Sequence, residues 1–230
     1  MDRSKYIEFA KENLGVEFKN IDKLIIALTH RSYLNEHKKT AKEHNERLEF
    51  LGDAVLELVV TEHLYLNYDE PEGILTNWRS SLVRTESLAE SASVLKIEEF
   101  IRSSKGESHA THHGRVQILA NSFEAIIGAL YLDSGYDISK EFIERTILAK
   151  FQDILDKGSW IDPKSKLQEI TQRDGHTPYY DVIEENGPDH DKNFIVGVYV
   201  DKKLLASGTG RSKQEAQQGA ARIALKKIDN

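Results

Sequence analysis

The pattern of apolar and polar residues divides the chain into two parts. Over the first 150 or so residues, apolar positions recur every three to four residues, which is the spacing of amphipathic helices. Helices are predicted over residues 21–28, 46–65, 79–95, 116–133 and 138–155. Residues 102–114 are rich in Ser, Gly, His and Thr, which favours a loop.

The composition changes after residue 155. Residues 156–163 mix polar residues with Gly and Pro, as linkers do. The pattern then predicts a helix over 165–173, strands over 179–185, 193–200 and 204–210, and a last helix that begins at Ser212. Glu215 completes a capping box with Ser212, and small residues in this helix permit close packing on a sheet: Ala216, Ala220, Ala221 and Ala224. We therefore predict an all-α domain at 1–155, a linker at 156–161 and a small α+β (α-β-β-β-α) domain at 162–229.

Composition narrows the class of protein. The chain has 230 residues, of which 39% are hydrophobic and 30% charged, as in ordinary globular proteins. It has no cysteine, which excludes disulfides, thiolate metal sites and a cysteine nucleophile. No stretch is apolar over the roughly 20 residues that a membrane span needs, and the N-terminus lacks the apolar core of a secretory signal. A cytoplasmic location is therefore expected, with no membrane partner.

The net charge of −7 is unevenly distributed. Residues 161–230 hold 11 basic and 11 acidic side chains, so the excess negative charge belongs to residues 1–160. An acidic domain repels nucleic acids, so a polyanionic partner requires bound cations or a separate binding face.

Three carboxylates share one face of the helix predicted over 46–65. Glu46, Glu49 and Asp53 follow the i, i+3, i+7 spacing, and apolar residues around them indicate a half-buried helix. Like charges in such a place need a counter-charge, which a hard divalent cation supplies through carboxylate oxygens. Gly52 is a poor helix former and indicates close approach of another backbone.

A second predicted helix carries Glu124 among apolar residues, with Asn121 one turn before it. If the two helices cross at these positions, three carboxylates and one amide surround a common point. Ion pairs with arginines or plain solvation are the alternative, with Arg47, Arg79 and Arg84 as candidate partners.

These segments resemble the ribonuclease III family, the nucleases that cut double-stranded RNA. The segment from Glu46 to Asp53 (ERLEFLGD) resembles the family signature, residues 28–33 (LTHRSY) an earlier family segment, and residues 118–125 (ILANSFEA) the second catalytic helix. The last 70 or so residues resemble a double-stranded-RNA-binding domain. The resemblance covers essentially the whole chain.

The resemblance implies a Mg²⁺-dependent endoribonuclease, with Mn²⁺ as an alternative ion. Glu49, Asp53 and Glu124 match the family's metal ligands, and Glu46 and Glu72 match acids of the surrounding catalytic valley. Two-metal hydrolysis would give 5′-phosphate and 3′-hydroxyl ends in the processing of rRNA and other structured RNAs. The family cuts both strands, so a homodimer through the catalytic domain is implied. We predict that apolar residues of 50–60, with those near Leu75 and Trp78, form the seam, which is the interface between the two chains.

Asn121 departs from the family pattern, which usually has Asp at the fourth catalytic position. An amide oxygen still ligates Mg²⁺ or a metal-bound water, but it brings no charge. Three interpretations stay open: a tolerated variant, an altered metal demand, or a catalytically impaired protein that only binds double-stranded RNA. We favour retained activity, with Asn121 counted among the metal and catalytic residues.

The tail resembles an RNA-binding domain at three places. The first helix, the loop after the first strand and the start of the last helix match the family's contacts to two minor grooves and the intervening phosphates. The matching residues are Gln168, Glu169, Gln172, Pro188, His190, Ser212, Lys213, Gln214 and Gln217. A rival zinc site at His109, His112 and His113 lacks a fixed scaffold, and a solvated loop is the simpler interpretation.

Overall fold

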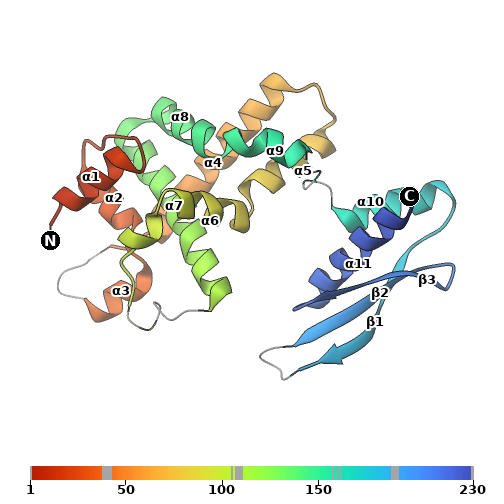
Figure 1. Cartoon of the computed structure of the whole chain (residues 1–230). Helices are drawn as coiled ribbons and strands as arrows, with labels where there is room; N and C mark the ends of the chain where they lie inside the picture. Colours follow the sequence, from red (N-terminus) through yellow and green to blue (C-terminus); the bar gives the residue numbers. More distant parts are fainter. Residues whose placement is uncertain are drawn as a thin grey trace. The chain divides into compact units, whose positions relative to one another are not determined.

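The computed structural model describes residues 2–37, 43–104, 106, 111–156, 158, 160, 162–187 and 192–228. Contacts divide the chain into two compact units, Met1–Trp160 and Ile161–Asn230 (Figure 1). Each unit has its own hydrophobic core. Within the described residues, no helix is long and apolar enough to cross a membrane.

The first unit is helical throughout its described residues, apart from loops and an isolated β-bridge between Thr29 and Arg102. The α-helices are α1 (Ser4–Glu12), α2 (Ile21–Ala27), α3 (Arg31–Glu36), α4 (Glu46–Asn67), α5 (Glu72–Val83), α6 (Thr85–Val94), α7 (His112–Ser134), α8 (Tyr136–Thr146) and α9 (Phe151–Asp156). Two 3₁₀ helices, η1 (Ile97–Phe100) and η3 (Leu148–Lys150), connect them. The predicted all-α fold is confirmed.

Two of the predicted single helices are wrong because each is interrupted. The stretch 79–95 breaks at Arg84, which has extended backbone (φ −63°, ψ 151°) between α5 and α6. The stretch 138–155 consists of α8, η3 and α9. Buried residues lie on both sides of each break, for example Leu82 and Leu88, so the apolar period continues where the backbone does not.

The predicted loop at 102–114 is also partly wrong. Thr111 caps α7 by accepting a hydrogen bond from the backbone N–H of Gly114, so His112 and His113 belong to the first turn of this helix. His109 lies outside the described residues. The described part of the chain contains no group of three His, Cys, Asp or Glu side chains placed to hold a metal.

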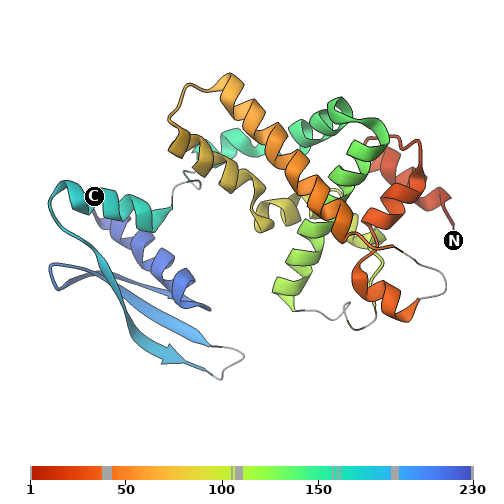
Figure 2. The same ribbon diagram turned by 180° about the vertical axis from the view of Figure 1, so that it is seen from behind.

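Helices α4 and α7 cross at the centre of the first unit (Figure 2) and make the most extensive contact between any two described elements. Their shared core includes Leu56, Phe123 and Ile127, each 0% exposed. The backbones touch at two glycines. A Cβ added to Gly52 would lie 1.8 Å from the carbonyl oxygen of Glu124, and one added to Gly128 would lie 2.1 Å from that of Leu48. The close approach predicted at Gly52 is confirmed.

Part of the predicted dimer seam is wrong, because it belongs to this unit's own core. Trp78 is 7% exposed and packs edge-to-face against Tyr68, Phe151 and Trp160, with ring centroids 5.2–5.8 Å apart. The buried residues of the 50–60 stretch include Val55, Leu56, Val59 and Val60. Phe50 and Leu58 are exposed on the opposite side of α4.

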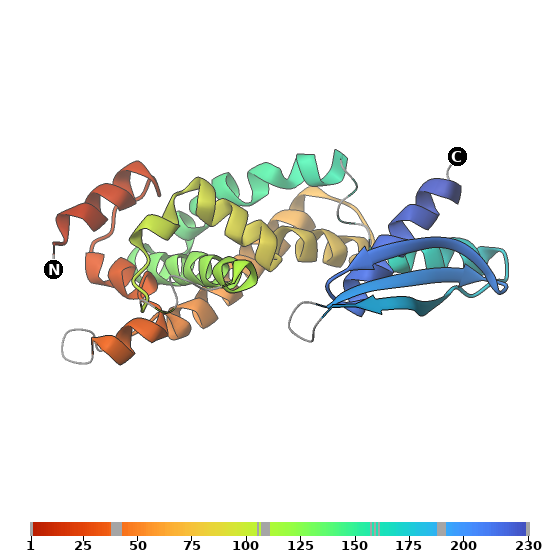
Figure 3. The same ribbon diagram turned by 60° about the horizontal axis from the view of Figure 1, so that its bottom comes forward.

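The second unit is a three-stranded antiparallel sheet with two helices on one face (Figure 3). Its elements are α10 (Pro163–Arg173), β1 (Tyr179–Asn186), β2 (Asn193–Val200), β3 (Lys203–Gly210) and α11 (Lys213–Ile228). The Ser212 hydroxyl accepts a hydrogen bond from the Glu215 N–H at 3.1 Å, and a Cβ on Gly208 would lie 2.1 Å from Ala220 N. The α-β-β-β-α order and the close packing of the alanine face are as predicted.

We predict that Gly52→Ala destabilises the first unit by about 3 kcal/mol or more, because its Cβ has no space against the α7 backbone. Gly73→Ala is the matched control. Gly73 lies exposed in α5, and an added Cβ would meet nothing within 4 Å beyond its chain neighbours and its own helix backbone, so this change is neutral or stabilising by up to about 1 kcal/mol. Urea unfolding curves measure both, and equal midpoints for the two variants would contradict the proposed contact.

Candidate active site

The α4–α7 crossing brings the predicted acids of the two helices together. Glu49 and Asp53 lie within two turns of Gly52 on α4, and Glu124 supplies the carbonyl that touches Gly52 from α7. Glu124 and Glu49 are half-buried, whereas Asp53 is exposed. Burial, together with the nearby charges of Asp53 and Glu49, raises the pKa of Glu124 to about 8. The three carboxylates are therefore electrostatically coupled.

Asn121 lies beside this cluster on α7. Its Oδ1 accepts a hydrogen bond from Gln117 Nε2 at 2.6 Å. Burial raises the pKa of Glu49, as do the charges of Glu46 and Asp53, and the nearby Asn121 amide opposes that shift. Gln117 was not singled out from the sequence, although it precedes Asn121 by one helical turn.

The acids lack the counter-charges that the arginine alternative requires. In the part of the chain that the structure describes, no ion pair joins Glu49, Asp53 or Glu124 to a basic side chain. Their donors are all oxygens, which fits a hard divalent cation. As placed, these carboxylates do not form a closed group of three around an ion, so binding requires them to converge by side-chain rotation.

The two remaining predicted acids lie apart from the cluster's centre. Glu46 begins α4, exposed, with its carboxylate oxygens 3.4 Å from Arg31 Nη1 and 3.8 Å from His44 Nδ1. Glu72 begins α5, accepts a hydrogen bond from Thr76 and lines a cavity of about 410 Å³ with Tyr65. Tyr65 is 12 residues beyond Asp53 on α4, or roughly 18 Å along the helix. One chain therefore does not bring Glu72 to the other acids.

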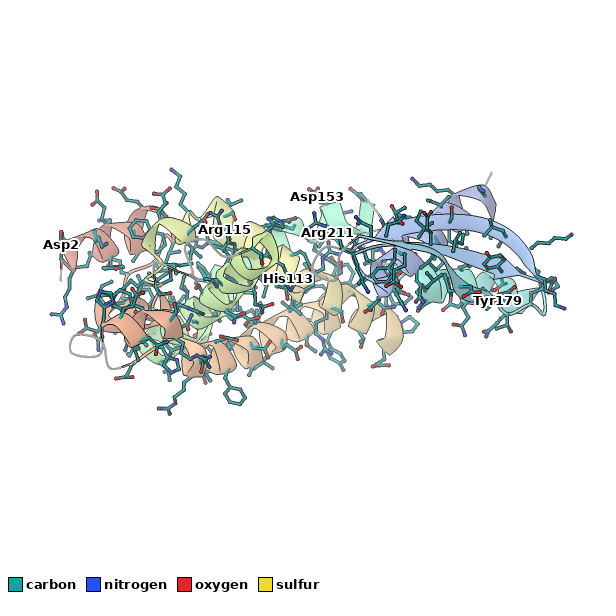
Figure 4. The ribbon with its side chains drawn as sticks, turned by 90° about the horizontal axis from the view of Figure 1, so that it is seen from below. Asp2, His113, Arg115, Asp153, Tyr179 and Arg211 are labelled. Carbon is teal, nitrogen blue, oxygen red and sulfur yellow. The ribbon has the colours of Figure 1, made fainter. Side chains whose placement is uncertain are left out.

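The second unit exposes the predicted polar stripe on α10. Gln168, Glu169 and Gln172 all face solvent. At the start of α11, Ser212, Lys213 and Gln214 are exposed and follow Arg211, which is labelled in Figure 4. Pro188 and His190 lie outside the described residues.

A hydrogen bond joins the two helical faces of this unit. Lys164 Nζ on α10 donates to Gln217 Oε1 on α11 at 2.7 Å. Lys164 was not predicted from the sequence, and it brings a positive charge between α10 and the first turns of α11.

Comparisons with known proteins match both units. A ribonuclease-III-like family model matches residues 21–151, and the double-stranded RNA binding motif matches residues 163–228. The Ribonuclease 3 of Listeria monocytogenes is 43% identical over 226 residues, covering 96% of this chain and 97% of that protein. The Ribonuclease 3 of Geobacillus kaustophilus is 44% identical over 231 residues, covering 98% and 92%. The chain belongs to the ribonuclease III family.

Solved structures agree with this membership. Two structures of the nuclease domain of ribonuclease III from Campylobacter jejuni are 41% and 40% identical, with TM-scores of 0.53 and 0.55. They cover 61% and 64% of this chain, and this chain covers 97% of each. The predicted family and enzyme class, a double-strand-specific endoribonuclease of ribonuclease III type, are confirmed.

We predict that the metal-free ribonuclease III unit loses stability as the pH rises from about 4.5 to about 8, because folding raises the pKa of Glu124 over that range. Below this window the Glu124 carboxyl is protonated in both the folded and the unfolded state, so it does not lower the free energy of unfolding. Above it the folded state holds an ionised carboxylate beside two others. Glu124→Gln removes the effect and melts several degrees above the unmodified chain at about pH 9.

Thermal unfolding in EDTA across this pH range measures the effect. Glu57→Gln, on the exposed surface of α4, is the control and should leave the pH profile unchanged. Parallel profiles for Glu124→Gln and the unmodified chain would contradict the raised pKa.

Proposed function

We propose that this chain is a Mg²⁺-dependent endoribonuclease that cuts double-stranded RNA to 5′-phosphate and 3′-hydroxyl ends, in the processing of rRNA and other structured RNAs. The observation that carries the proposal is the set of uncompensated carboxylates at the α4–α7 crossing. Mn²⁺ has the same preference for oxygen ligands and is the alternative ion.

In this proposal Glu49, Asp53 and Glu124 hold the divalent cation. When bound, such ions activate a water for in-line attack and stabilise charge on the attacking and leaving oxygens. Glu124 is largely protonated at neutral pH in the metal-free chain, because its pKa is about 8, and it must release that proton to become a ligand. Glu46 is exposed at the start of α4, where we propose that it contacts solvent and RNA.

The second unit provides most of the affinity for RNA in this proposal. The stripe of Gln168, Glu169 and Gln172 supplies donors and acceptors for ribose 2′-hydroxyls in a minor groove. The start of α11 offers free backbone N–H groups, the helix dipole and the charge of Lys213 to phosphates. Pro188 and His190 remain assigned to the second minor-groove contact.

We further propose that two chains associate through the exposed apolar face of α4. Phe50, Leu58 and Tyr65 recur at spacings of eight and seven residues, so they lie along one side of the helix, and they are 81%, 56% and 75% exposed. One of the similar C. jejuni nuclease-domain structures is described as having a region involved in dimer formation. Glu72 lines a cavity with Tyr65, so a seam along this face would bring Glu72 to the partner's site rather than to its own.

The central test is cleavage of a long RNA duplex with Mg²⁺, beside an EDTA control. We expect cleavage by the unmodified chain and none by Glu124→Gln, which should still bind the duplex with nearly unchanged affinity, because binding lies mainly in the second unit. Gel-shift titration without metal measures the binding. Intact RNA after incubation with the unmodified chain would instead support a catalytically impaired RNA-binding protein.

The association is tested by sedimentation at micromolar concentration. We expect the 26.2 kDa chain to sediment as a dimer and Phe50→Glu to sediment as a monomer, because the charge would be buried in an apolar seam. Ile7→Glu is the control, since Ile7 is 54% exposed on α1, away from α4. A monomeric unmodified chain would refute this part of the proposal.

A further inference from the structure

Lys164 places a positive charge where the start of α10 meets the first turns of α11. Its Nζ donates a hydrogen bond to Gln217 Oε1 at 2.7 Å and lies 5.0 Å from the centre of the Tyr180 ring. Both Lys164 and Gln217 are half-buried. In the part of the chain that the structure describes, no ion pair joins Lys164 to a carboxylate. The ammonium group is therefore held by an amide and an aromatic ring, which restrain it without neutralising its charge.

The backbone that carries Lys164 is fastened to α11 as well. Asp162 caps α10 by accepting a hydrogen bond from the Ser165 N–H at 2.8 Å, and its other oxygen accepts one from Gln218 Nε2 on α11. Asp162 is the carboxylate that lies two residues before Lys164, and both of its oxygens are bound to neutral donors. Lys164 thus extends from a fixed helix start.

The hydrogen bond to Gln217 leaves donors for a further partner. An ammonium group has three N–H donors and no acceptor, so the Gln217 oxygen must face Lys164 and its amino group must point elsewhere. Lys164 precedes Gln168 by four residues on α10, and Gln217 follows Lys213 by four residues on α11. The pair therefore lies between the two surfaces to which RNA contacts are assigned above.

We propose that Lys164 is a further RNA-contact residue, which donates to a backbone phosphate between the minor groove met by α10 and the phosphates met by the start of α11. Gln217 is its positioning partner and offers its own amino group to the same phosphate. The inference rests on the proposed function and deepens it, because it makes the two RNA-binding surfaces of the second unit continuous.

The charges of this unit show why Lys164 matters. Residues 161–230 hold 11 basic and 11 acidic side chains, so the unit attracts a polyanion only where its basic groups gather. Glu169 adds a negative charge to the polar stripe of α10, which RNA phosphates repel. Lys164 lies at the head of the same stripe and offsets that charge.

The salt dependence of duplex binding tests the inference. The full chain is titrated in EDTA against an RNA duplex of about 20 base pairs, which is long enough for one such unit, between about 50 and 200 mM salt. For Lys164→Gln we expect binding about three- to tenfold weaker at about 100 mM salt, and a slope of log affinity against log salt that is shallower by about 1. Lys164→Arg keeps the charge and should restore the slope and bring the affinity to within about twofold.

Lys166→Gln is the matched control. It removes the same charge from the same helix, but Lys166 lies about 200° around α10 from Lys164, away from the stripe. Its slope and affinity should stay close to those of the unmodified chain. Thermal unfolding of each variant confirms that the second unit is folded.

A substitution at Gln217 separates a phosphate contact from a purely structural bond. Gln217→Glu would form an ion pair with Lys164, which keeps α10 tied to α11 but neutralises the ammonium charge. We expect weaker binding and a shallower slope without loss of thermal stability. If Lys164 only tied the helices together, this variant would bind as the unmodified chain does.

The outcomes distinguish this inference from the proposed function. A folded Lys164→Gln that keeps the slope of the unmodified chain would overturn the RNA contact, and so would equal losses in Lys164→Gln and Lys166→Gln. Failure of the unmodified chain to bind the duplex would refute the proposed function itself, and the contact with it.

Discussion

The backbone contact between α4 and α7 is the constraint on which the rest of the first unit depends. Gly52 and Gly128 let the two helices meet with no side chain between them, so each glycine lies against a carbonyl of the other helix. Residues within two turns on either side must then face one another. The carboxylates of Glu49 and Glu124 are neighbours because the glycines are, and no local property of either helix would bring them together.

This contact also explains how the fold tolerates like charges at its centre. Bringing carboxylates together in a half-buried place is unfavourable, and the raised pKa values of Glu124 and Glu49 express that cost. The apolar core that flanks the crossing, including Leu56 and Phe123 at 0% exposure, supplies the offsetting free energy. The site is thus held together by packing rather than by a bound cation.

Much of this was predictable because it depends on local patterns. Single helices and strands were enough to predict the spacing of the acids, the close contact at Gly52, the capping box at Ser212 and the order of elements in the second unit. The predictions that failed were those that depend on tertiary packing. Trp78 has the sequence context of an exposed aromatic, and only the arrangement of α5 and α9 buries it. The turn at Arg84 was invisible because the apolar period runs through it, and the Gln117 bond depends on side-chain directions that spacing does not show.

Asn121 connects the electrostatics of the site with its stability. A fourth carboxylate would add attraction for a cation and, without the cation, repulsion against Glu49. The neutral amide of Asn121 gives up part of that attraction and adds no repulsion. The chain carries its excess negative charge in the same unit, so each further carboxylate there adds to the existing repulsion. A neutral amide at position 121 therefore lowers the electrostatic cost of folding this crossing when no cation is bound.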